Sequence, residues 1–466
     1  MRRAALLYLF LLGSAGIAML LGANGCSSGN PFQNPFGPSK IQHVVIIFQE
    51  NRTPDNLFQD PVLISAGADI ASSGLNSSGQ MIQLTPESLG VNYHLSHAHS
   101  AFVKQYDGGK MDGADLVPIA CNVAPCPLNP QYFYVQSSDV QPYFQMAEQY
   151  TFGDRMFQTN EGPSFPAHQF IISGTSAPTA TSNLFVSENT SVGTGCAAPP
   201  SADVFVVDPQ GKESSKIYPC TEHPTLTDQL NAKNLSWRYY TPSATSIWTG
   251  PNAIQHMCGP NVPPPNGTAC TGSDWVNHVV IYNGHNPAPI LTDITNNQLP
   301  AVSWVIPAGK NSDHAGNQND LGGPSWVASI ANTIGNNSYW ANTAIIVTWD
   351  HWGGWYDHVP PPQVIADGTS WGSGYVYGFR VPLIVISPYA KAAHISHVNH
   401  DFGSILHFME ENFGLSSLGY ADARADDLSD CFDFNQTPLV FQTINAPFSA
   451  SHFLNDRTPP GDPDDD

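Results

Sequence analysis

The stretch "IQHVVIIFQENRTPDNLF", residues 41–58, joins a run of apolar residues to a polar cluster. The apolar run over Val44–Phe48 predicts a buried β-strand, because it is short, continuous and rich in β-branched residues. Four polar residues follow it: Glu50, Asn51, Arg52 and Asp55. Burying polar groups costs free energy unless they find partners, so this cluster indicates that something binds at the strand end.

Strands and helices alternate along the rest of the chain. Apolar runs predict further strands at the ends of 140–157 and 225–240, and at 301–307, 344–349 and 379–390. Helices are predicted early in 140–157 and 225–240, and at 325–335 and 401–415, the last with Asp401 near its start and Gly414 at its end. This pattern predicts an α/β sheet covered on both faces, in one domain over 41–450. Gly, Ser and Pro-rich stretches at 62–100, 176–220 and 250–275 predict loops. Residues 451–466 are an acidic tail, whose end "DRTPPGDPDDD" (456–466) is expected to be disordered.

The first 40 residues predict export. Arg2 and Arg3 precede an apolar stretch that ends in small residues at Cys26, as in a bacterial lipoprotein signal over 1–26. An ordinary signal peptide or an uncleaved anchor helix is the alternative. Residues 27–40 then form a polar, Pro-rich tether. We therefore expect a periplasmic or cell-surface protein that touches the membrane only through a lipid on Cys26.

The seven later cysteines are expected to be partly oxidised in an exported protein. Proximity in sequence suggests the pairs Cys121–Cys126, Cys196–Cys220 and Cys258–Cys270, and a free Cys431, although connectivity does not follow from sequence. The absence of paired CxxC motifs argues against a structural zinc site.

Composition limits the partners. Charged residues make up only 12% of the chain, and 38 acidic against 16 basic residues give a formal charge of −22. Such a surface repels phosphate backbones, which excludes general nucleic-acid binding. An anionic small-molecule substrate would need a metal ion or local cations in its pocket. We expect a monomer.

Two more polar clusters follow predicted strands. Asp350-His351 comes after "TAIIVTW", and Asp313-His314 comes shortly after "AVSWVIP". Sites in open α/β sheets form beyond the carboxyl ends of strands, so these clusters can meet Glu50 and Asn51 in one pocket. Their oxygen and nitrogen atoms suit a divalent cation. Each pair alone is equally typical of a turn.

Ser164, in "NEGPSFPAHQFIISGTS" (160–176), precedes an apolar segment that looks helical. A serine at a helix N-terminus suits a nucleophile or a bound phosphoryl group, although Ser is also a favoured N-cap. A further stretch, "SHAHSAFVKQYDGGKMDG" (96–113), places His97 and His99 before a Gly-Gly turn with Lys110.

These stretches resemble motifs of the bacterial phosphoesterase family that holds secreted phospholipases C and acid phosphatases. The strand followed by "ENRTPD" resembles the family's opening motif, "DGGKMDG" (107–113) its N-G-G-K-M-D-G, and "GPSFPAH" (162–168) its G-P-[ST]-x-P-N-R. "DHWGGWYDHV" (350–359) and "SHVNHDFGSILHFMEENFGL" (396–415) are similar to its later segments.

The resemblance implies an alkaline phosphatase-like three-layer sandwich, with a central mixed sheet and a smaller loop-rich lobe. It also implies metal-assisted hydrolysis of a lipid or small-molecule phosphoester through a phosphoseryl intermediate. In this reading Ser164 is the nucleophile, and His97 and His314 protonate the leaving group or contact the phosphoryl oxygens. One divalent cation (Ca, Mg, Mn or Zn) is held by Glu50, Asn51, Asp350 and His351. His256, His168 and Lys110 are the substrate-binding candidates.

Two departures from the family pattern bear on activity. His351 stands where the family usually has Glu, which moves the expected metal site toward mixed ligands. Ala167-His168 replaces Asn-Arg, which removes a planar phosphate clamp unless His168 is protonated. A catalytically impaired surface lipoprotein is therefore the rival function. A sulfatase-like enzyme is a weaker rival, because the chain has no C-x-P-x-R motif.

Overall fold

A nine-stranded mixed sheet forms the centre of the structure, a computed structural model that describes residues 40–259, 269–316, 322–362 and 377–460. In spatial order the strands are β13 (Val279–Ile281), β12 (Trp237–Thr241), β14 (Val302–Val305), β1 (His43–Gln49), β15 (Thr343–Trp349), β16 (Arg380–Ile386), β8 (Thr151–Phe157) and β17 (His394–Ser396), with β18 (His400–Asp401) paired to β8. Neighbours from β13 to β15 are parallel, and β16 runs antiparallel between β15 and β8. The predicted α/β class with a mixed central sheet is confirmed.

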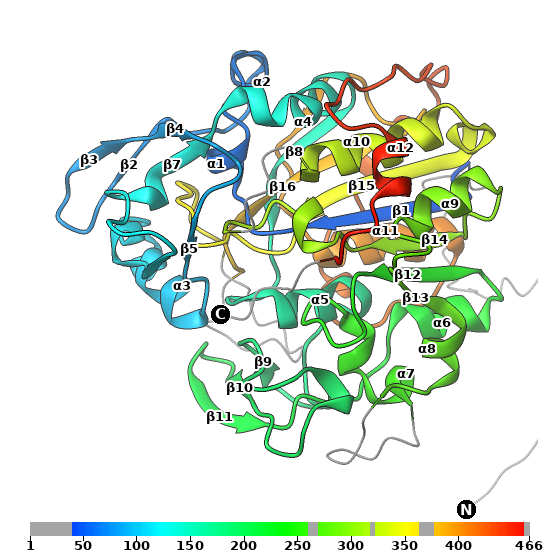
Figure 1. Cartoon of the computed structure of the whole chain (residues 1–466), viewed down its shortest axis with the longest axis horizontal. Helices are drawn as coiled ribbons and strands as arrows, with labels where there is room; N and C mark the ends of the chain where they lie inside the picture. Colours follow the sequence, from blue (N-terminus) through cyan, green and yellow to red (C-terminus); the bar gives the residue numbers. More distant parts are fainter. Residues whose placement is uncertain (1–39, 260–268, 317–321, 363–376, 461–466) are drawn as a thin grey trace, which may run out of the picture. The chain divides into compact units, whose positions relative to one another are not determined.

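The central strands are continuously apolar because both faces of the sheet are covered. Every residue of β15 and of β16 is buried. In Figure 1 the helices α10 (Gly322–Gly335) and α12 (Ala450–Asn455) lie in front of the sheet, and α11 (Phe402–Phe413) lies behind it. Helix α10 packs against α4 (Ser137–Gln149), and α11 packs against α5 (Ser164–Ser173).

The predicted ends of the 401–415 helix are confirmed. The Asp401 carboxylate accepts a hydrogen bond from the Ser404 backbone N–H, and Gly414 ends the helix in the left-handed conformation. Both are standard end signals, one satisfying a free N–H group and the other a conformation that glycine adopts without strain.

Regions expected as loops contain short strands and helices. Within 62–100 these are the end of α2 (Pro61–Ala66), β2 (Ser73–Leu75), β3 (Met81–Gln83), β4 (Thr85–Glu87), β5 (Tyr93–Leu95) and the start of α3 (His99–Tyr106). Within 176–220 they are β9 (Phe185–Val186), β10 (Val204–Val207) and β11 (Glu213–Ile217). Strands of two to five residues are too short for a periodic pattern to reveal them.

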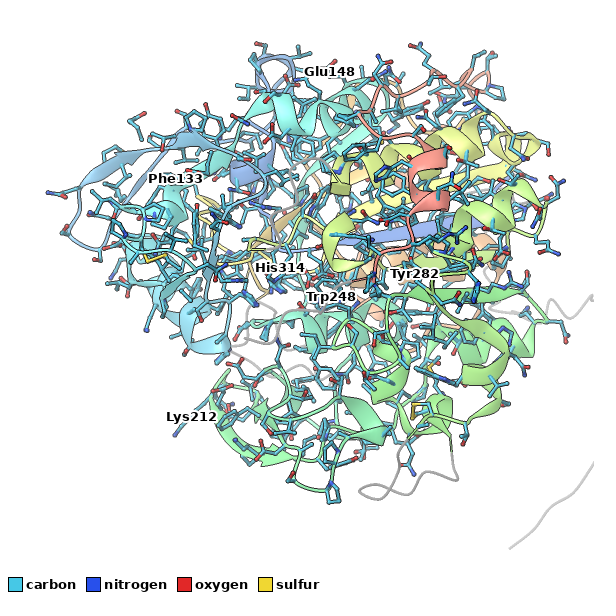
Figure 2. The ribbon with its side chains drawn as sticks, in the orientation of Figure 1. Phe133, Glu148, Lys212, Trp248, Tyr282 and His314 are labelled. Carbon is cyan, nitrogen blue, oxygen red and sulfur yellow. A yellow bond between two sulfur atoms is a disulfide. The ribbon has the colours of Figure 1, made fainter. Side chains whose placement is uncertain are left out.

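All three expected disulfides are present. Cys121–Cys126, Cys196–Cys220 and Cys258–Cys270 are bonded, and Cys431 is a buried free thiol. Such bonds appear in yellow in Figure 2. Each cross-links residues that are close in sequence and restricts the unfolded chain.

The expectation of a disordered end over 456–466 of the acidic tail needs correction for its first residues. Helix α12 buries Phe453, and Asp456 forms an ion pair with Lys310. A six-residue helix is too short to show a hydrophobic period. The predicted signal peptide and Cys26, the tether up to residue 39, and residues 461–466 lie outside the described residues. None of the described helices is both long and apolar enough to cross a bilayer.

Candidate active site

Parallel pairing of β1 with β15 brings two polar clusters together. Gln49 lies opposite Trp349 in the register, so Glu50 and Asp350 leave the sheet side by side. The Asp350 carboxylate oxygen Oδ1 accepts hydrogen bonds from the backbone N–H groups of Asn51 (2.9 Å) and His351 (2.8 Å). Asp350 is therefore fixed in orientation by the chain that follows each strand.

Asn51, next to Glu50 in the chain, has a buried side-chain oxygen that is unsatisfied. Its side chain is 1% exposed, and Oδ1 has no hydrogen-bond partner. Its backbone has φ 61°, in the left-handed region that Asn tolerates better than most residues. A buried acceptor without a donor is rare and indicates a missing partner, for which a cation is suited.

Ser164 is the first residue of α5, and its side chain is fully buried. Its hydroxyl donates toward Glu50 Oε2 at 3.4 Å, and its Oγ lies 3.0 Å from His351 Nε2. The positive end of the helix dipole favours negative charge at this position. The serine predicted as nucleophile thus lies within hydrogen-bond distance of two predicted metal ligands.

His351 acts as a donor in this arrangement. Its Nδ1 accepts a hydrogen bond from the Gly353 backbone N–H at 3.1 Å, so in the neutral ring Nε2 carries the proton. Nε2 faces both Ser164 Oγ and, at 3.1 Å, Asp350 Oδ2. This differs from the expectation that His351 binds a metal, because neither ring nitrogen then offers a lone pair.

Asp350 is held in the ionised form. Burial alone would raise the pKa of its carboxyl, but the neighbouring His351 and hydrogen bonds with His351 and Glu50 lower the pKa below its ordinary value. An anionic carboxylate beside Glu50 in a fully buried pocket requires positive charge nearby.

His168 lies in the same cluster. Its Nε2 is 3.2 Å from Glu50 Oε1, and its Nδ1 is 3.3 Å from the Tyr239 hydroxyl oxygen. Complete burial lowers the pKa of His168 to about 3, so the ring is neutral. A neutral imidazole cannot replace the arginine clamp that the family usually has at this position. Ligand atoms of Glu50, His168 and Asp350 all lie within 4.8 Å of one another, as in a metal site.

His97 and His314 border the cluster. The His97 ring stacks on His351 with centroids 4.5 Å apart, and the His314 ring lies 5.9 Å from that of His97. His314 also lies near Trp248, 6.2 Å between ring centroids (Figure 2). The Nδ1 atoms of His97 and His314 lie 3.0 and 2.5 Å from the carbonyl oxygens of Leu95 and Ala315, which can only accept. Each Nε2 is therefore the nitrogen that can take up or release a proton.

A family model, described as the phosphoesterase family, matches residues 41–416. The chain belongs to the phosphoesterase family. The chain is 24% identical over 435 residues to a non-hemolytic phospholipase C of Pseudomonas aeruginosa, covering 84% of this chain and 57% of that protein. It is 33% identical over 171 residues to phospholipase C B of Mycobacterium tuberculosis, covering 33% of each. The match thus covers little more than half the length of the first relative and a third of the second.

Among solved structures, a protein in the alkaline phosphatase superfamily from Vibrio parahaemolyticus aligns with 84% of this chain and 73% of its own. The sequence identity is 11% and the TM-score is 0.36.

Two predicted substrate-binding residues lie apart from the cluster. Lys110 has a largely exposed side chain and forms an ion pair with Asp107 at 2.6 Å. His256 pairs with Glu222 at 3.0 Å and Asp228 at 3.4 Å, on α7 (Gln255–Cys258). The family motif "DGGKMDG" therefore directs its lysine outward. The structure brings together the other eight predicted residues: Glu50, Asn51, His97, Ser164, His168, His314, Asp350 and His351.

Sequence reasoning missed Tyr239 and Gly353, which orient the two unusual histidines. Tyr239 lies within β12 (Trp237–Thr241), where its aromatic side chain looks like an ordinary core residue. Gly353 lies in the family motif after β15, and only its contact with His351 reveals a role.

Proposed function

We propose that the protein hydrolyses phosphate esters through a phosphoseryl intermediate on Ser164. One observation carries the proposal: the buried Ser164 Oγ lies at the start of a ten-residue helix, 3.0 Å from His351 Nε2 and 3.4 Å from Glu50 Oε2. A nucleophile beside a donor and a carboxylate, under the positive end of a helix, is suited to attack on phosphorus.

A divalent cation fits the site. Glu50, Asn51 and Asp350 would hold it, because the first and third supply carboxylates and Asn51 supplies a buried oxygen without a hydrogen-bond partner. When bound, such an ion polarises a phosphoryl oxygen and lowers the pKa of a nearby hydroxyl. The donor atoms present leave the choice among Ca, Mg, Mn and Zn to the experiments below.

The side chains then divide the reaction between them. Ser164 passes its proton toward Glu50, and Oγ attacks phosphorus in line with the leaving oxygen, whose bond to phosphorus breaks. His97 or His314 gives that oxygen a proton from Nε2. His351 donates to Oγ and stabilises its developing charge, an effect that burial strengthens. Water then attacks phosphorus and gives a proton to that histidine, the P–Oγ bond breaks, and Ser164 regains its proton from Glu50.

The substrate class is a phospholipid diester or a small phosphomonoester. The relatives named phospholipase C favour the lipid, and a lipid anchor on Cys26 of an exported protein would hold the site near membranes. An acid phosphatase-like monoesterase uses the same groups, so a substrate comparison is needed. We propose that the enzyme acts outside the cytoplasm as a monomer.

A substrate panel with matched serine variants tests the function. Ser164→Ala should lower turnover of p-nitrophenyl phosphate, bis-p-nitrophenyl phosphate or phosphatidylcholine by a factor on the order of 10³ or more. Ser173→Ala is the control, because Ser173 ends the same helix and its hydroxyl donates only to the carbonyls of Gln169 and Thr175. Circular dichroism checks that both variants fold.

Removal of metal by a chelator tests whether activity depends on a divalent cation. Treatment with EDTA should remove activity, and one divalent metal should restore it in the wild type and not in Ser164→Ala. Full turnover by Ser164→Ala would rule out the nucleophile. An inactive wild type that binds metal and folds would instead favour the impaired surface lipoprotein.

A further inference from the structure

We infer that His168 binds the cation through Nε2, so that the site combines one nitrogen with carboxylate and amide oxygens. The inference rests on the proposed function only in taking the site to bear a metal. It assigns to the histidine at the family's arginine position a role different from substrate binding. The geometry around the ring carries it in three steps.

The first step fixes the tautomer of His168. The Tyr239 hydroxyl donates its hydrogen to the Trp248 carbonyl oxygen at 2.9 Å, and its oxygen accepts from the Gly250 backbone N–H at 3.3 Å. With its hydrogen already used, Tyr239 can only accept from His168 Nδ1, 3.3 Å away. Nδ1 therefore carries the proton of a neutral His168, and Nε2 carries the lone pair.

The second step concerns what Nε2 faces. It lies 3.2 Å from the Glu50 carboxylate oxygen Oε1, and both side chains are 0% exposed. Two acceptors at this distance repel unless a cation lies between or beside them. Asp350 supplies a third ligand atom within 4.8 Å of the other two, so the three side chains form a group that could hold one metal ion.

The third step is that the ring is held in place. The Phe48 ring packs edge-on against His168, with centroids 4.8 Å apart. A Cβ on Gly250 would lie 2.2 Å from the His168 carbonyl oxygen, so the backbone at Gly250 packs directly against this turn of α5. A histidine whose second nitrogen donates to a fixed acceptor is the usual form of a metal ligand.

His351 provides the internal contrast. Its Nδ1 accepts from Gly353, so its Nε2 is protonated and cannot bind a cation. His168 faces Glu50 through Nε2 and His351 faces Asp350 through Nε2, with opposite hydrogen positions on the two rings. A nitrogen ligand also changes the metal preference, because imidazole binds Zn²⁺ better than it binds the hard ion Ca²⁺.

The test measures metal binding rather than activity. The full chain is freed of metal and titrated with Zn²⁺ and Ca²⁺ in competition with a chelator, as wild type, His168→Gln, His351→Gln and Tyr239→Phe. We expect His168→Gln to weaken Zn²⁺ binding by about 100-fold and Ca²⁺ binding by only a few-fold, and Tyr239→Phe to weaken Zn²⁺ binding by about 10-fold. His351→Gln should change Zn²⁺ affinity by less than about 10-fold.

Pulsed EPR of the Mn²⁺-loaded protein reads the ligand directly. Wild type and His351→Gln should show ¹⁴N coupling from a bound imidazole, and His168→Gln should lose it. If His168→Gln does not fold, the ¹⁴N coupling of His351→Gln and the Zn²⁺ affinity of Tyr239→Phe decide instead.

Several outcomes overturn the inference: no metal bound, no ¹⁴N coupling, coupling lost in His351→Gln, or unchanged Zn²⁺ affinity in His168→Gln. The last would mean that a proton, not a metal, joins His168 and Glu50. Failure of the proposed function is separate. Nitrogen-ligated metal in a protein that hydrolyses none of the phosphoesters leaves the inference standing, whereas activity without nitrogen coupling overturns the inference alone.

Discussion

Asn51 combines an unusual backbone conformation with a buried side-chain oxygen that can bind a cation. Its backbone has φ 61°, its Oδ1 is buried without a hydrogen-bond partner, and its backbone approaches Gly353 closely. A Cβ on Gly353 would lie 2.5 Å from the Asn51 carbonyl oxygen and 2.6 Å from its Cβ. Gly353 itself has φ 66°, so glycine is required here for both space and conformation.

Gly353→Ala should therefore displace Asn51 and weaken both stability and metal affinity. The left-handed conformation costs an alanine about 1–2 kcal/mol, and the overlap adds about 1–3 kcal/mol. Gly79→Ala is the matched control, because Gly79 has φ 76° and nothing within 4 Å of an added Cβ. Urea unfolding and Zn²⁺ titration compare the two variants. Equal losses in both would mean that Gly353 does not position Asn51.

At this scale the sequence predicted which residues come together better than it predicted the hydrogen bonds between them. Polar residues after apolar strands, with motif resemblance, correctly gathered Glu50, Ser164 and Asp350. The roles of His168 and His351 depend on which ring nitrogen is protonated. That choice is made by Tyr239 and Gly353, through contacts that no spacing in the chain encodes.

At the scale of elements, a buried ion cluster joins β16 to α1 (Pro54–Leu57) and to the segment after β15. Arg380 begins β16 and bonds to Asp55 (3.2 Å) and Asp357 (2.9 Å). His358 bonds to Asp55 through Nδ1 (2.7 Å) and to Asp69 through Nε2 (3.0 Å). These ion pairs fix the strand ends that carry the site. Only Asp55, Asp357 and His358 lie in stretches that resemble family motifs, so the sequence did not reveal the cluster.

The cluster predicts a pH dependence of stability. Burial would lower the pKa of His358, but hydrogen bonding and attraction to Asp55 outweigh it and raise the pKa from 6.5 to about 9. The protonated ring therefore stabilises the fold fully below pH 6.5, and this stabilisation is lost as the pH rises through 9. The pKa of Asp357, raised to about 6 by burial, falls below that window.

His358→Gln should thus lower the free energy of unfolding by about 1–3 kcal/mol at pH 6.5, with allowance for a side chain that is 28% exposed. At pH 9.5 the difference from wild type should largely vanish. Urea unfolding at the two pH values measures it, with the exposed His285→Gln as control. A destabilisation independent of pH would show that His358 acts by packing and not by charge.

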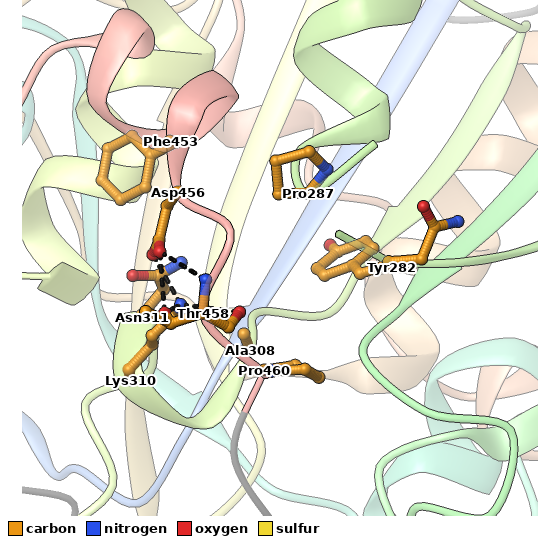
Figure 3. Close-up of a pocket in the computed structure, with 10 residues that line it drawn as sticks. Tyr282, Pro287, Ala308, Lys310, Asn311, Phe453, Asp456, Thr458 and Pro460 are labelled. Carbon is orange, nitrogen blue, oxygen red and sulfur yellow. Dashed lines mark hydrogen bonds and ion pairs between the residues drawn. The ribbon is translucent and has the colours of Figure 1, made fainter. Parts of the chain in front are cut away.

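At the scale of the whole molecule, the C-terminal residues 450–460 pack against helices that cover the sheet. Helix α12 contacts α10 and α9 (Pro289–Thr295), and the Phe453 ring packs edge-on against Trp326 with centroids 5.2 Å apart. Beyond it, Lys310 bonds to Asp456 and Thr458 beside a pocket that Tyr282 also lines (Figure 3). Since Lys310 lies just after β14, the C-terminal segment braces the same end of the sheet that carries His314.

Phe453→Ala should therefore destabilise the whole fold, although it lies outside the matched family region. Phe453 is 2% exposed, and truncating a buried phenylalanine costs about 3–5 kcal/mol. Val440→Ala, at a side chain 86% exposed in the same C-terminal stretch, should change stability by less than about 0.5 kcal/mol. Urea midpoints of both variants measure the difference. If Phe453→Ala matched Val440→Ala, residues 450–459 would be an appendage as the acidic composition suggested; a large loss would make them part of the sheet's support.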